Sequence, residues 1–303
     1  MIRWQVKADD PKVLREFLKT KNVSRRIIGR VKFHGGQFSV NGRAVHTREV
    51  LQIGDCVGME LPLEPANPDL YTSPLPLNIL YEDEQYLVIN KPAGLISTPS
   101  RLFKGDTAAA RVKHYLMQQN ARHQVVHTVT RLDRFTSGVM LFAKNMYVHS
   151  MLGQLLVANQ LERSYLAVTK GHFHEKKGTI TAPIARKDSS IIERQIHPTG
   201  QYAKTSYQVL AEFDDYSLVA AQLHTGRTHQ IRVHFQHLGH PLVGDDLYDE
   251  ASSFIDRQAL HCQKLSFIDP WTAEPFVQEA PLPKDIQQFI RQVGGINWLE
   301  KED

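Results

Sequence analysis

Short runs of β-favouring residues between positions 79 and 293 constrain the fold of this 303-residue chain more than any other feature. These runs lie at residues 86–89, 139–142, 165–168 and 216–219. Helical stretches are expected at residues 108–119 and 145–158, but helices do not follow every strand as they would in a βαβ repeat. The pattern therefore favours a mixed α+β domain with a largely antiparallel β-sheet.

The first sixty residues predict a small αβ unit of two helices and short strands. Asp10, which is followed by proline, is expected to start the first helix. Ser24 is expected to cap the second helix, which should end at Gly35. The pair Asn41-Gly42 is typical of the tight turn of a β-hairpin.

Proline content divides the chain into parts. A proline-rich stretch after this unit reads as a semi-rigid linker, because proline fixes φ and removes a hydrogen-bond donor. The predicted parts are a small unit at 1–64, a linker at 65–78, a body at 79–293 and a polar tail at 294–303.

Positive charge is concentrated in the small unit. Residues 1–60 contain twelve Lys or Arg and six Asp or Glu, whereas the rest of the chain contains 24 and 26. Arg25 and Arg26 open the second predicted helix, where guanidinium groups can contact phosphates. The asymmetry indicates a polyanion-binding module on a near-neutral body. A solvated basic surface is the alternative that charge alone leaves open.

Cysteine usage and hydropathy indicate the compartment. The two cysteines, Cys56 and Cys262, are far apart in sequence, which fits a reducing environment better than a disulfide framework. Both thiols are expected to be buried. The N-terminus lacks the apolar segment of a signal peptide, and no apolar stretch reaches membrane-spanning length. We therefore expect a cytoplasmic protein without membrane contact.

Asp133 is the first candidate for chemistry. It lies between Arg131 and Arg134, just before Thr136 and an apolar strand. Taken alone, such an Asp is more often part of a salt-bridged surface loop. A carboxylate that nearby cations keep ionised is also available as a nucleophile or base, and the mouth of a strand holds it rigidly.

The segment from His224 to His234 is the second candidate. Arg232 is a natural ion-pair partner for a distant carboxylate, because guanidinium offers a fixed fork of donors. Periodicity does not decide between a strand and a helix that begins after Thr228. Five histidines between positions 224 and 240 raise the alternative of a zinc site, but zinc ligands usually have closer paired spacing, so no metal is expected.

Tyr165 is the third candidate. A tyrosine at the start of a strand usually serves packing. In an RNA site it can also stack on an extruded base and offer its hydroxyl to a proton transfer.

Six short motifs, in this order, make residues 79–285 similar to the RluA-type pseudouridine synthases. The motifs are N-K-P-A-G, R-L-D-R-F-T-S-G, R-S-Y-L-A, G-R-T-H-Q-I-R-V-H, G-H-P-L-V-G-D and A-L-H-C-Q-K-L-S-F. Residues 9–61 resemble the small RNA-binding module first recognised in a small-subunit ribosomal protein, the S-four fold. The family usually has His before R-L-D, where this chain has Thr130.

The resemblance implies an isomerase that converts uridine in RNA to pseudouridine without metal or other cofactor. It implies that Asp133 is the essential carboxylate, that Tyr165 stacks on the base and moves a proton at C5, and that Arg232 pairs with Asp133. The expected RNA contacts in the body are Arg131, Arg134, Thr136, Arg227, His229, Gln230 and Ile231. Arg25 and Arg26 are the expected contacts in the small unit.

RNA is the expected partner, with ribosomal RNA favoured over transfer RNA by analogy. We expect a monomer without an obligatory protein partner. Two alternatives remain open from the sequence: a non-catalytic RNA-binding or ribosome-assembly factor on the same fold, and a zinc-dependent hydrolase built on the histidines.

Overall fold

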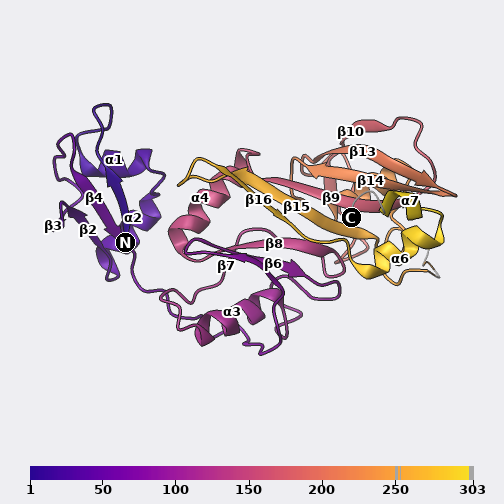
Figure 1. The fold of residues 1–303 in the computed structure, drawn as a ribbon, viewed down its shortest axis with the longest axis horizontal. Coiled ribbons are helices and arrows are strands. Elements are labelled where there is room, and N and C mark those ends of the chain that lie inside the picture. Colours follow the sequence, from indigo (N-terminus) through magenta and orange to yellow (C-terminus); the bar gives the residue numbers. More distant parts are fainter. Residues whose placement is uncertain (250–251, 253, 300–303) are drawn as a thin grey trace.

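The computed structural model describes residues 1–249, 252 and 254–299. Figure 1 shows a small unit at one end of an elongated molecule, joined to a large body built around a long β-sheet. Helix α4 (Met146–Val157) lies on the side of the body that faces the small unit, and the C-terminal helices lie at the opposite end.

The small unit is an antiparallel four-stranded sheet with two helices. Its strands follow the order β1-β4-β2-β3. Its elements are β1 (Ile2–Gln5), α1 (Leu14–Thr20), α2 (Arg25–Phe33), β2 (Gln37–Val40), β3 (Arg43–Val45) and β4 (Cys56–Glu60). Asn41 and Gly42 both have positive φ, 51° and 82°, as this two-residue hairpin turn requires. The predicted hairpin is confirmed.

One of the two expected helix starts is confirmed and the other is wrong. The Ser24 side chain accepts a hydrogen bond from the Ile27 amide at 3.3 Å and caps α2. Helix α1, in contrast, begins at Leu14 rather than at Asp10. The Asp10 carboxylate instead accepts from the Lys7 amide at 2.8 Å and pairs with Lys21 at 2.9 Å. These contacts close a turn that a helix beginning at Asp10 would not form.

The body is a mixed α+β domain with a largely antiparallel sheet, as expected. In the part of the chain that the structure describes, ten strands form one sheet along the path β10-β13-β14-β9-β15-β8-β6-β5, with β16 on β15 and β7 on β8. Its pairs are antiparallel apart from β15 with β8, which is parallel. The first five strands of this sheet in chain order are β5 (Ile79–Glu82), β6 (Tyr86–Lys91), β7 (His127–Thr128), β8 (Ser137–Ala143) and β9 (Glu162–Lys170).

The later strands complete this sheet and add a small separate hairpin. They are β10 (Lys177–Thr181), β13 (Lys204–Phe213), β14 (Tyr216–Leu223), β15 (Leu260–Ile268) and β16 (Pro275–Glu279), and the hairpin is β11 (Ile184–Arg186) with β12 (Arg194–Ile196). The other helices are α3 (Ala108–Gln118), α5 (Gln230–His237), α6 (Lys284–Gln292) and α7 (Ile296–Leu299). Helix α7 lies within the predicted polar tail, whose residues 300–303 fall outside the described part.

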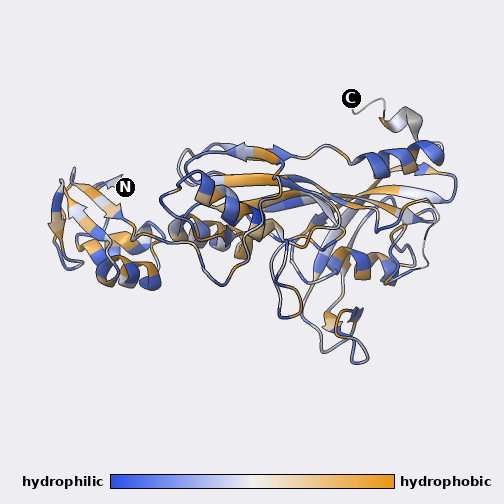
Figure 2. Ribbon diagram, turned by 90° about the horizontal axis from the view of Figure 1, so that it is seen from below, coloured by the Kyte–Doolittle hydropathy of each residue, from blue (hydrophilic) through white to orange (hydrophobic). Residues whose placement is uncertain are grey.

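Helices cover both faces of the sheet at β6 and β8. Leu87 and Ile89 pack with α3 on one face, whereas Tyr86 and Val88 pack towards α4 on the other. A strand buried on both faces needs apolar residues at every position, which explains the continuous hydrophobic run at 86–89. Figure 2 shows the hydrophobic colouring along the central strands, with mixed colouring on the helices.

Helix α4 also packs against the small unit. The Tyr147 ring makes an edge contact with Trp4 at 6.0 Å between centroids, and its hydroxyl donates to the Lys21 carbonyl at 2.7 Å. Met151 joins the same core, while Val148 and Leu152 face the sheet. Because α4 is buried on two sides, it places the small unit directly against the body.

The connector between the two parts packs along α3. Ser73 and the side chains of Arg111 and Lys113 make hydrogen bonds between α3 and residues 70–76. Of the two cysteines, both free, Cys262 is buried as expected, whereas Cys56 is exposed, so that expectation was wrong. Among the described helices, none combines the length and hydropathy needed to cross a bilayer.

Candidate active site

Asp133 stands in a loop whose neighbouring residues are pinned to the body. The Ser97 hydroxyl accepts from the Leu132 amide at 3.0 Å and donates to the Leu132 carbonyl at 2.6 Å. The Lys91 ammonium donates to the carbonyl of Arg134 at 3.1 Å. Asp133 itself keeps its side chain about a quarter exposed. The loop thus presents, on a fixed backbone, a carboxylate that accepts no hydrogen bond from the described residues.

The other side of the loop is fixed as well. The Thr130 hydroxyl accepts from the Leu141 amide at 2.9 Å, so the residue that replaces the family's usual His has a structural partner. Arg257 donates to the carbonyl of Phe135 at 3.1 Å. The Thr136 hydroxyl accepts from Gln258, which leaves this buried threonine as a support of the loop.

Lys91 is an unusual support because it is fully buried. Its ammonium donates to the carbonyls of Pro92 and Leu95 in addition to that of Arg134. Burial lowers the pKa of Lys91 to about 7, although the charge of Asp133 acts in the opposite direction. A buried cation with three carbonyl partners favours a single arrangement of the loop.

Glycine is required where the loop enters β8. Gly138 has φ of +114°, and a Cβ there would lie 2.1 Å from the carbonyl oxygen of Cys262. Strand β15 therefore runs very close to β8 at the point where the two pair in parallel. This close approach brings the start of β15 beneath the loop of Asp133.

Arg232 lies on α5, which answers the question that periodicity left open. The helix begins after His229, whose φ of 56° is left-handed. Arg232 Nη1 lies 3.7 Å from Asp133 Oδ2, while its Nε and Nη2 donate to Asp245 at 2.7 and 2.6 Å. The Tyr248 ring lies under the guanidinium at 4.9 Å. The main partner of Arg232 is therefore Asp245, and Asp133 is the second.

Electrostatics keep this cluster charged. Desolvation lowers the pKa of Arg232, but the hydrogen bonds and charge of Asp245, with the charge of Asp133, raise it above the usual value. His229 hydrogen-bonds through Nδ1 to the Tyr248 hydroxyl at 2.8 Å. Burial lowers the pKa of His229, so its imidazole is neutral at pH 7.

Gln230 shapes the turn before α5. Its side-chain oxygen accepts from the Thr225 hydroxyl at 2.7 Å and from the Arg227 amide at 3.0 Å. Its nitrogen donates to the Lys204 carbonyl and to the Thr205 hydroxyl. The amide is fully used inside the protein, so Gln230 fits a positioning role better than the expected contact with RNA.

Tyr165 is buried on β9 and lines the same cavity as Asp133. Desolvation raises the pKa of its hydroxyl well above the usual value, helped by Cys262 and by the charge of Asp133. The hydroxyl is therefore protonated at neutral pH. A flat aromatic face beside a carboxylate suits the stacking of a base.

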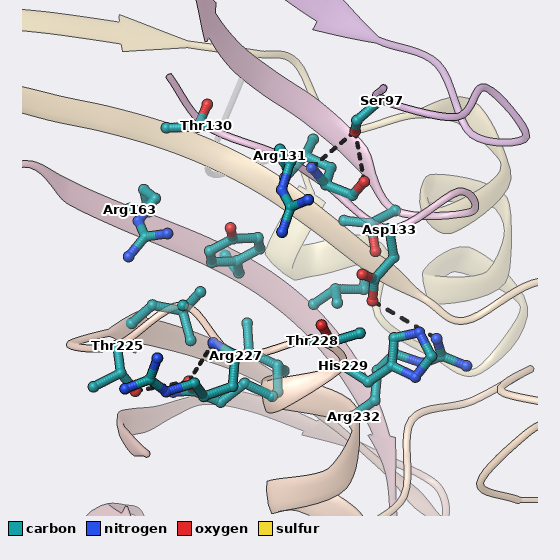
Figure 3. A pocket seen from close by; sticks show the side chains of 18 of the residues that line it. Ser97, Thr130, Arg131, Asp133, Arg163, Thr225, Arg227, Thr228, His229 and Arg232 are labelled. Carbon is teal, nitrogen blue, oxygen red and sulfur yellow. Dashed lines mark hydrogen bonds and ion pairs between the residues drawn. The ribbon is translucent and has the colours of Figure 1, made fainter. Parts of the chain in front are cut away.

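One cavity of about 640 Å³ brings these groups together, as Figure 3 shows. This size falls in the range of small-molecule sites. The expected residues that line the cavity are Arg131, Asp133, Arg134, Thr136, Tyr165, Arg227, His229, Gln230, Ile231 and Arg232. Arg25 and Arg26 are not among them, because they lie on α2 of the small unit.

The five histidines do not converge. His224 and His229 line the cavity, whereas His234 hydrogen-bonds to Thr205 and His240 to the Lys170 carbonyl. Within residues 1–249, 252 and 254–299 no group of three His, Cys, Asp or Glu is arranged to hold a metal ion.

Five residues of the site were missed by sequence reasoning. They are Ser97, Lys91, Arg163, Asp245 and Tyr248. The motif G-H-P-L-V-G-D ends at Asp245, so its presence in a motif could have marked this carboxylate as functional. The motif does not show which cation Asp245 pairs with.

Comparison with solved structures first identifies the class of fold. The human RNA Pseudouridylate Synthase Domain Containing 1 superposes with a TM-score of 0.57 at 25% identity, over 73% of this chain and 96% of that chain. The human RNA Pseudouridylate Synthase Domain Containing 4 does so with a TM-score of 0.58 at 23% identity, over 71% and 92%. The body therefore has the fold of a pseudouridylate synthase domain.

Comparison of sequences then identifies the family. The model of the family described as RNA pseudouridylate synthase matches residues 85–237. The "Uncharacterized RNA pseudouridine synthase YjbO" of Bacillus subtilis is 44% identical, over 92% of this chain and 98% of that protein. The "Ribosomal large subunit pseudouridine synthase D" of Xanthomonas campestris is 35% identical, over 84% and 80%. The chain belongs to the RNA pseudouridine synthases, isomerases that form pseudouridine in RNA.

Proposed function

We propose that Asp133 is the essential carboxylate of this pseudouridine synthase, with Arg232 as its cation and Tyr165 as the residue that stacks on the uracil. The observation that carries this proposal is the 3.7 Å ion pair of Asp133 with Arg232 in the wall of the cavity that Tyr165 also lines. Arg232 in turn is oriented by Asp245, so the Asp133 carboxylate lines the cavity next to a fixed positive charge.

The reaction needs no group from outside the RNA. The N1–C1′ bond of uridine breaks, the uracil turns, C5 bonds to C1′, the proton on C5 leaves and N1 ends protonated. Asp133 faces the sugar, and the target nucleotide first leaves its stack at a cost of a few kcal/mol. Because the Tyr165 hydroxyl is protonated, it takes up the C5 proton only as it gives up its own.

The remaining cavity residues fall into two groups in this proposal. Three exposed arginines line the cavity: Arg131, Arg134 and Arg227. They bind phosphates of the RNA or occupy the space that the flipped nucleotide leaves in the stack. The wall is shaped, and its backbone held, by the buried residues Thr136, Gln230 and Ile231 and by the half-buried His229.

We propose that residues 1–64 form an RNA-binding domain of the S-four type, followed by a linker at 65–78, the catalytic domain at 79–293 and a tail at 294–303. The exposed arginines Arg25, Arg26 and Arg30 and Lys32 on α2 support this, because none has an ion-pair partner among the described residues. Such unpaired charges suit phosphates, which position an RNA without reading its sequence.

Ribosomal RNA of the large subunit is the proposed substrate, and transfer RNA is the alternative. The support is the name of the 35% identical relative from Xanthomonas campestris, a large-subunit enzyme. We propose a cytoplasmic monomer: one chain supplies the whole cavity, and both cysteines are free thiols.

Replacement of Asp133 by Asn tests the catalytic assignment. RNA from a strain without the gene is incubated with wild-type or variant protein, and pseudouridine is mapped at each uridine. We expect Asp133→Asn to fold normally and to form no pseudouridine. Asp69→Asn, which changes an exposed aspartate of the connector, should act like the wild type. Turnover by Asp133→Asn would refute the assignment, and loss of activity in both variants would point to a damaged preparation. If neither the wild type nor any variant modifies any RNA, the non-catalytic alternative gains support.

A further inference from the structure

Arg163 is a cavity arginine without a partner inside the protein. It is half-buried on β9, its Nε is buried and unpaired, and no hydrogen bond or ion pair involves its guanidinium among the described residues. Arg134, Arg227 and Arg232 of the same cavity each donate to a protein oxygen. A guanidinium that is partly removed from water without an acceptor is costly, so this group is suited to an acceptor that arrives with the substrate.

The position of Arg163 relates it to Tyr165. The two residues are two apart on one strand, so their side chains share a face, and both line the cavity. The hydroxyl of Tyr165 responds to both ends of the site: the charge of Arg163 lowers its pKa, and that of Asp133 raises it. Figure 3 shows Arg163 and Asp133 on opposite sides of the cavity. Tyr165 thus shares the face of β9 with Arg163 and lines the same cavity as both Arg163 and Asp133.

The geometry of uridine indicates which part of the base would lie at Arg163. In the uracil ring, C4 lies directly opposite N1, the atom that carries the sugar. If C1′ is held at Asp133 and the ring stacks on Tyr165, the C4 edge points towards Arg163. We propose that Arg163 donates a hydrogen bond to the C4 carbonyl oxygen of the target uracil and thereby selects uracil over cytosine. This inference rests on the proposed placement of the sugar at Asp133.

Cytosine fails this test for a chemical reason. It carries an amino group at C4, and a donor facing the donors of a guanidinium leaves both groups unpaired. Sites that hydrogen-bond a substrate group strongly reject analogues that lack the matching partner. Arg163 is therefore a specificity-determining residue, separate from the groups that act at the sugar.

The turn of the uracil fits the same donor. When C5 takes the former place of N1, the C2 carbonyl takes the former place of the C4 carbonyl, because C2 lies opposite C5 in the ring. A guanidinium fixed at that end can therefore donate to the C4 carbonyl before the turn and to the C2 carbonyl after it. Arg163 would then hold the base before and after its turn.

The surroundings of Arg163 favour a strong hydrogen bond there. Leu156, Val157 and Leu223 line the same cavity with apolar side chains. Gly226 lies against the guanidinium, and a Cβ at that position would come 3.1 Å from Nη1. The guanidinium is thus half-buried with the backbone of Gly226 against it, and reduced contact with water strengthens a charge-assisted hydrogen bond.

Substitution of one substrate atom tests the assignment. The substrate is a synthetic RNA that spans a uridine mapped as a target, made with either uridine or 4-thiouridine at that position. Sulfur accepts hydrogen bonds weakly, so the wild-type single-turnover rate should fall by about 10- to 100-fold on 4-thiouridine. Arg163→Met should lose a similar factor on uridine and respond far less to 4-thiouridine. Intrinsic effects of sulfur on the chemistry cancel between the two proteins.

Two further comparisons make the result decisive. Arg131→Met, at an exposed arginine of the same cavity, should slow both substrates by the same factor. In competition for binding, RNA with cytidine at the target should gain on uridine RNA in Arg163→Met relative to the wild type. If Arg163→Met and the wild type lose the same factor on 4-thiouridine, Arg163 contacts another group, such as a phosphate, and the inference is overturned.

A conservative variant separates a hydrogen bond to the base from a purely structural role of Arg163. Arg163→Lys keeps a cationic donor and should keep more sensitivity to 4-thiouridine than Arg163→Met, which a purely structural role would not produce. If Arg163→Lys responds to 4-thiouridine no more than Arg163→Met does, the inference fails. Turnover by Asp133→Asn would instead overturn the placement of the sugar. An inactive Asp133→Asn together with an unchanged sulfur effect in Arg163→Met would overturn the reading of Arg163 alone.

Discussion

At the scale of single residues, the geometry of the site depends on how the contacts of Arg232 are divided between Asp245 and Asp133. Its two-pronged pair with the fully buried Asp245 satisfies the guanidinium geometry, while Asp133 lies at 3.7 Å from the third nitrogen. Asp133 is thus held near a cation, but the hydrogen bonds of that cation go to Asp245 instead. A carboxylate in the tighter position would be less available to a substrate.

Asp245→Asn tests this division. Loss of the buried charge leaves Arg232 with a single, more distant carboxylate, so we expect a destabilisation of about 2–4 kcal/mol in urea unfolding. We also expect kcat to fall by at least about 10-fold, because the cation loses its orientation. Asp246→Asn changes the exposed neighbour and should alter neither quantity. Equal stability of Asp245→Asn and the wild type would show that the pair contributes no net stability, and an unchanged kcat would show that it does not orient Arg232.

At the scale of elements, the exposed cations of α2 are separate from the cavity of the body. Its buried face, with Ile27, Ile28 and Val31, packs into the small unit, and its exposed face carries unpaired cations. These cations lie on a different part of the molecule from the cavity residues of the body. Their removal should weaken RNA binding without a change in the chemical step.

The double variant Arg25→Gln with Arg26→Gln measures this contribution. Removal of one cation from a phosphate reduces the slope of log affinity against log salt by about 0.9, so removal of two reduces it by about 2. The slope is obtained from filter binding across a salt series, and the single-turnover rate at saturating RNA should be unchanged. Lys19→Gln, at a lysine already paired with Glu16, should change the slope less. An unchanged slope in the double variant would contradict RNA binding at this end of α2.

Local sequence signals predicted elements better than partners. The Asn41-Gly42 turn, the Ser24 cap and the helix predicted at 145–158 follow from propensities of neighbouring residues. All three are present, the helix as Met146–Val157. The start at Asp10 was wrong because a carboxylate that caps a helix equally well closes a turn, and contacts with Lys7 and Lys21 decided between them. Periodicity describes one segment at a time and cannot show such choices.

The site itself was predicted in part. A resemblance of motifs placed Asp133, Tyr165 and Arg232 together, and the structure puts all three around one cavity. It did not show that Asp245 is the closer partner of Arg232, or that Arg163 is left unpaired. Both facts depend on the packing of side chains from β9, α5 and the turn after it, which no single segment encodes.

At the scale of the whole molecule, buried histidines make stability depend on pH. Burial lowers the pKa of His229 and His234, and it lowers the pKa of His261 to about 4. His261 hydrogen-bonds to Ser137 and to the Ala280 carbonyl, which suits a neutral ring. A His with a lowered folded pKa takes up its proton in the unfolded chain first, so acid favours unfolding.

We therefore expect the free energy of unfolding to fall as pH falls from about 6.5 towards 4, and to be flat above that range for these groups. His261 alone should contribute about 3 kcal/mol across this window. Urea unfolding at a series of pH values measures the slope. His261→Gln should reduce it, whereas a slope identical to the wild type would show that His261 does not titrate differently in the two states.

The parallel pairing of β15 with β8 also has a consequence for the timing of synthesis. Ser137 and His261 touch across 124 residues of chain, and β15 separates β8 from β9 in the finished sheet. A ribosome that adds about 5–20 residues per second takes about 6 to 25 s to make the segment between them. During that interval the strand that follows the loop of Asp133 lacks its pairing with His261 and Cys262, so this part of the cavity is complete only after β15 has been made.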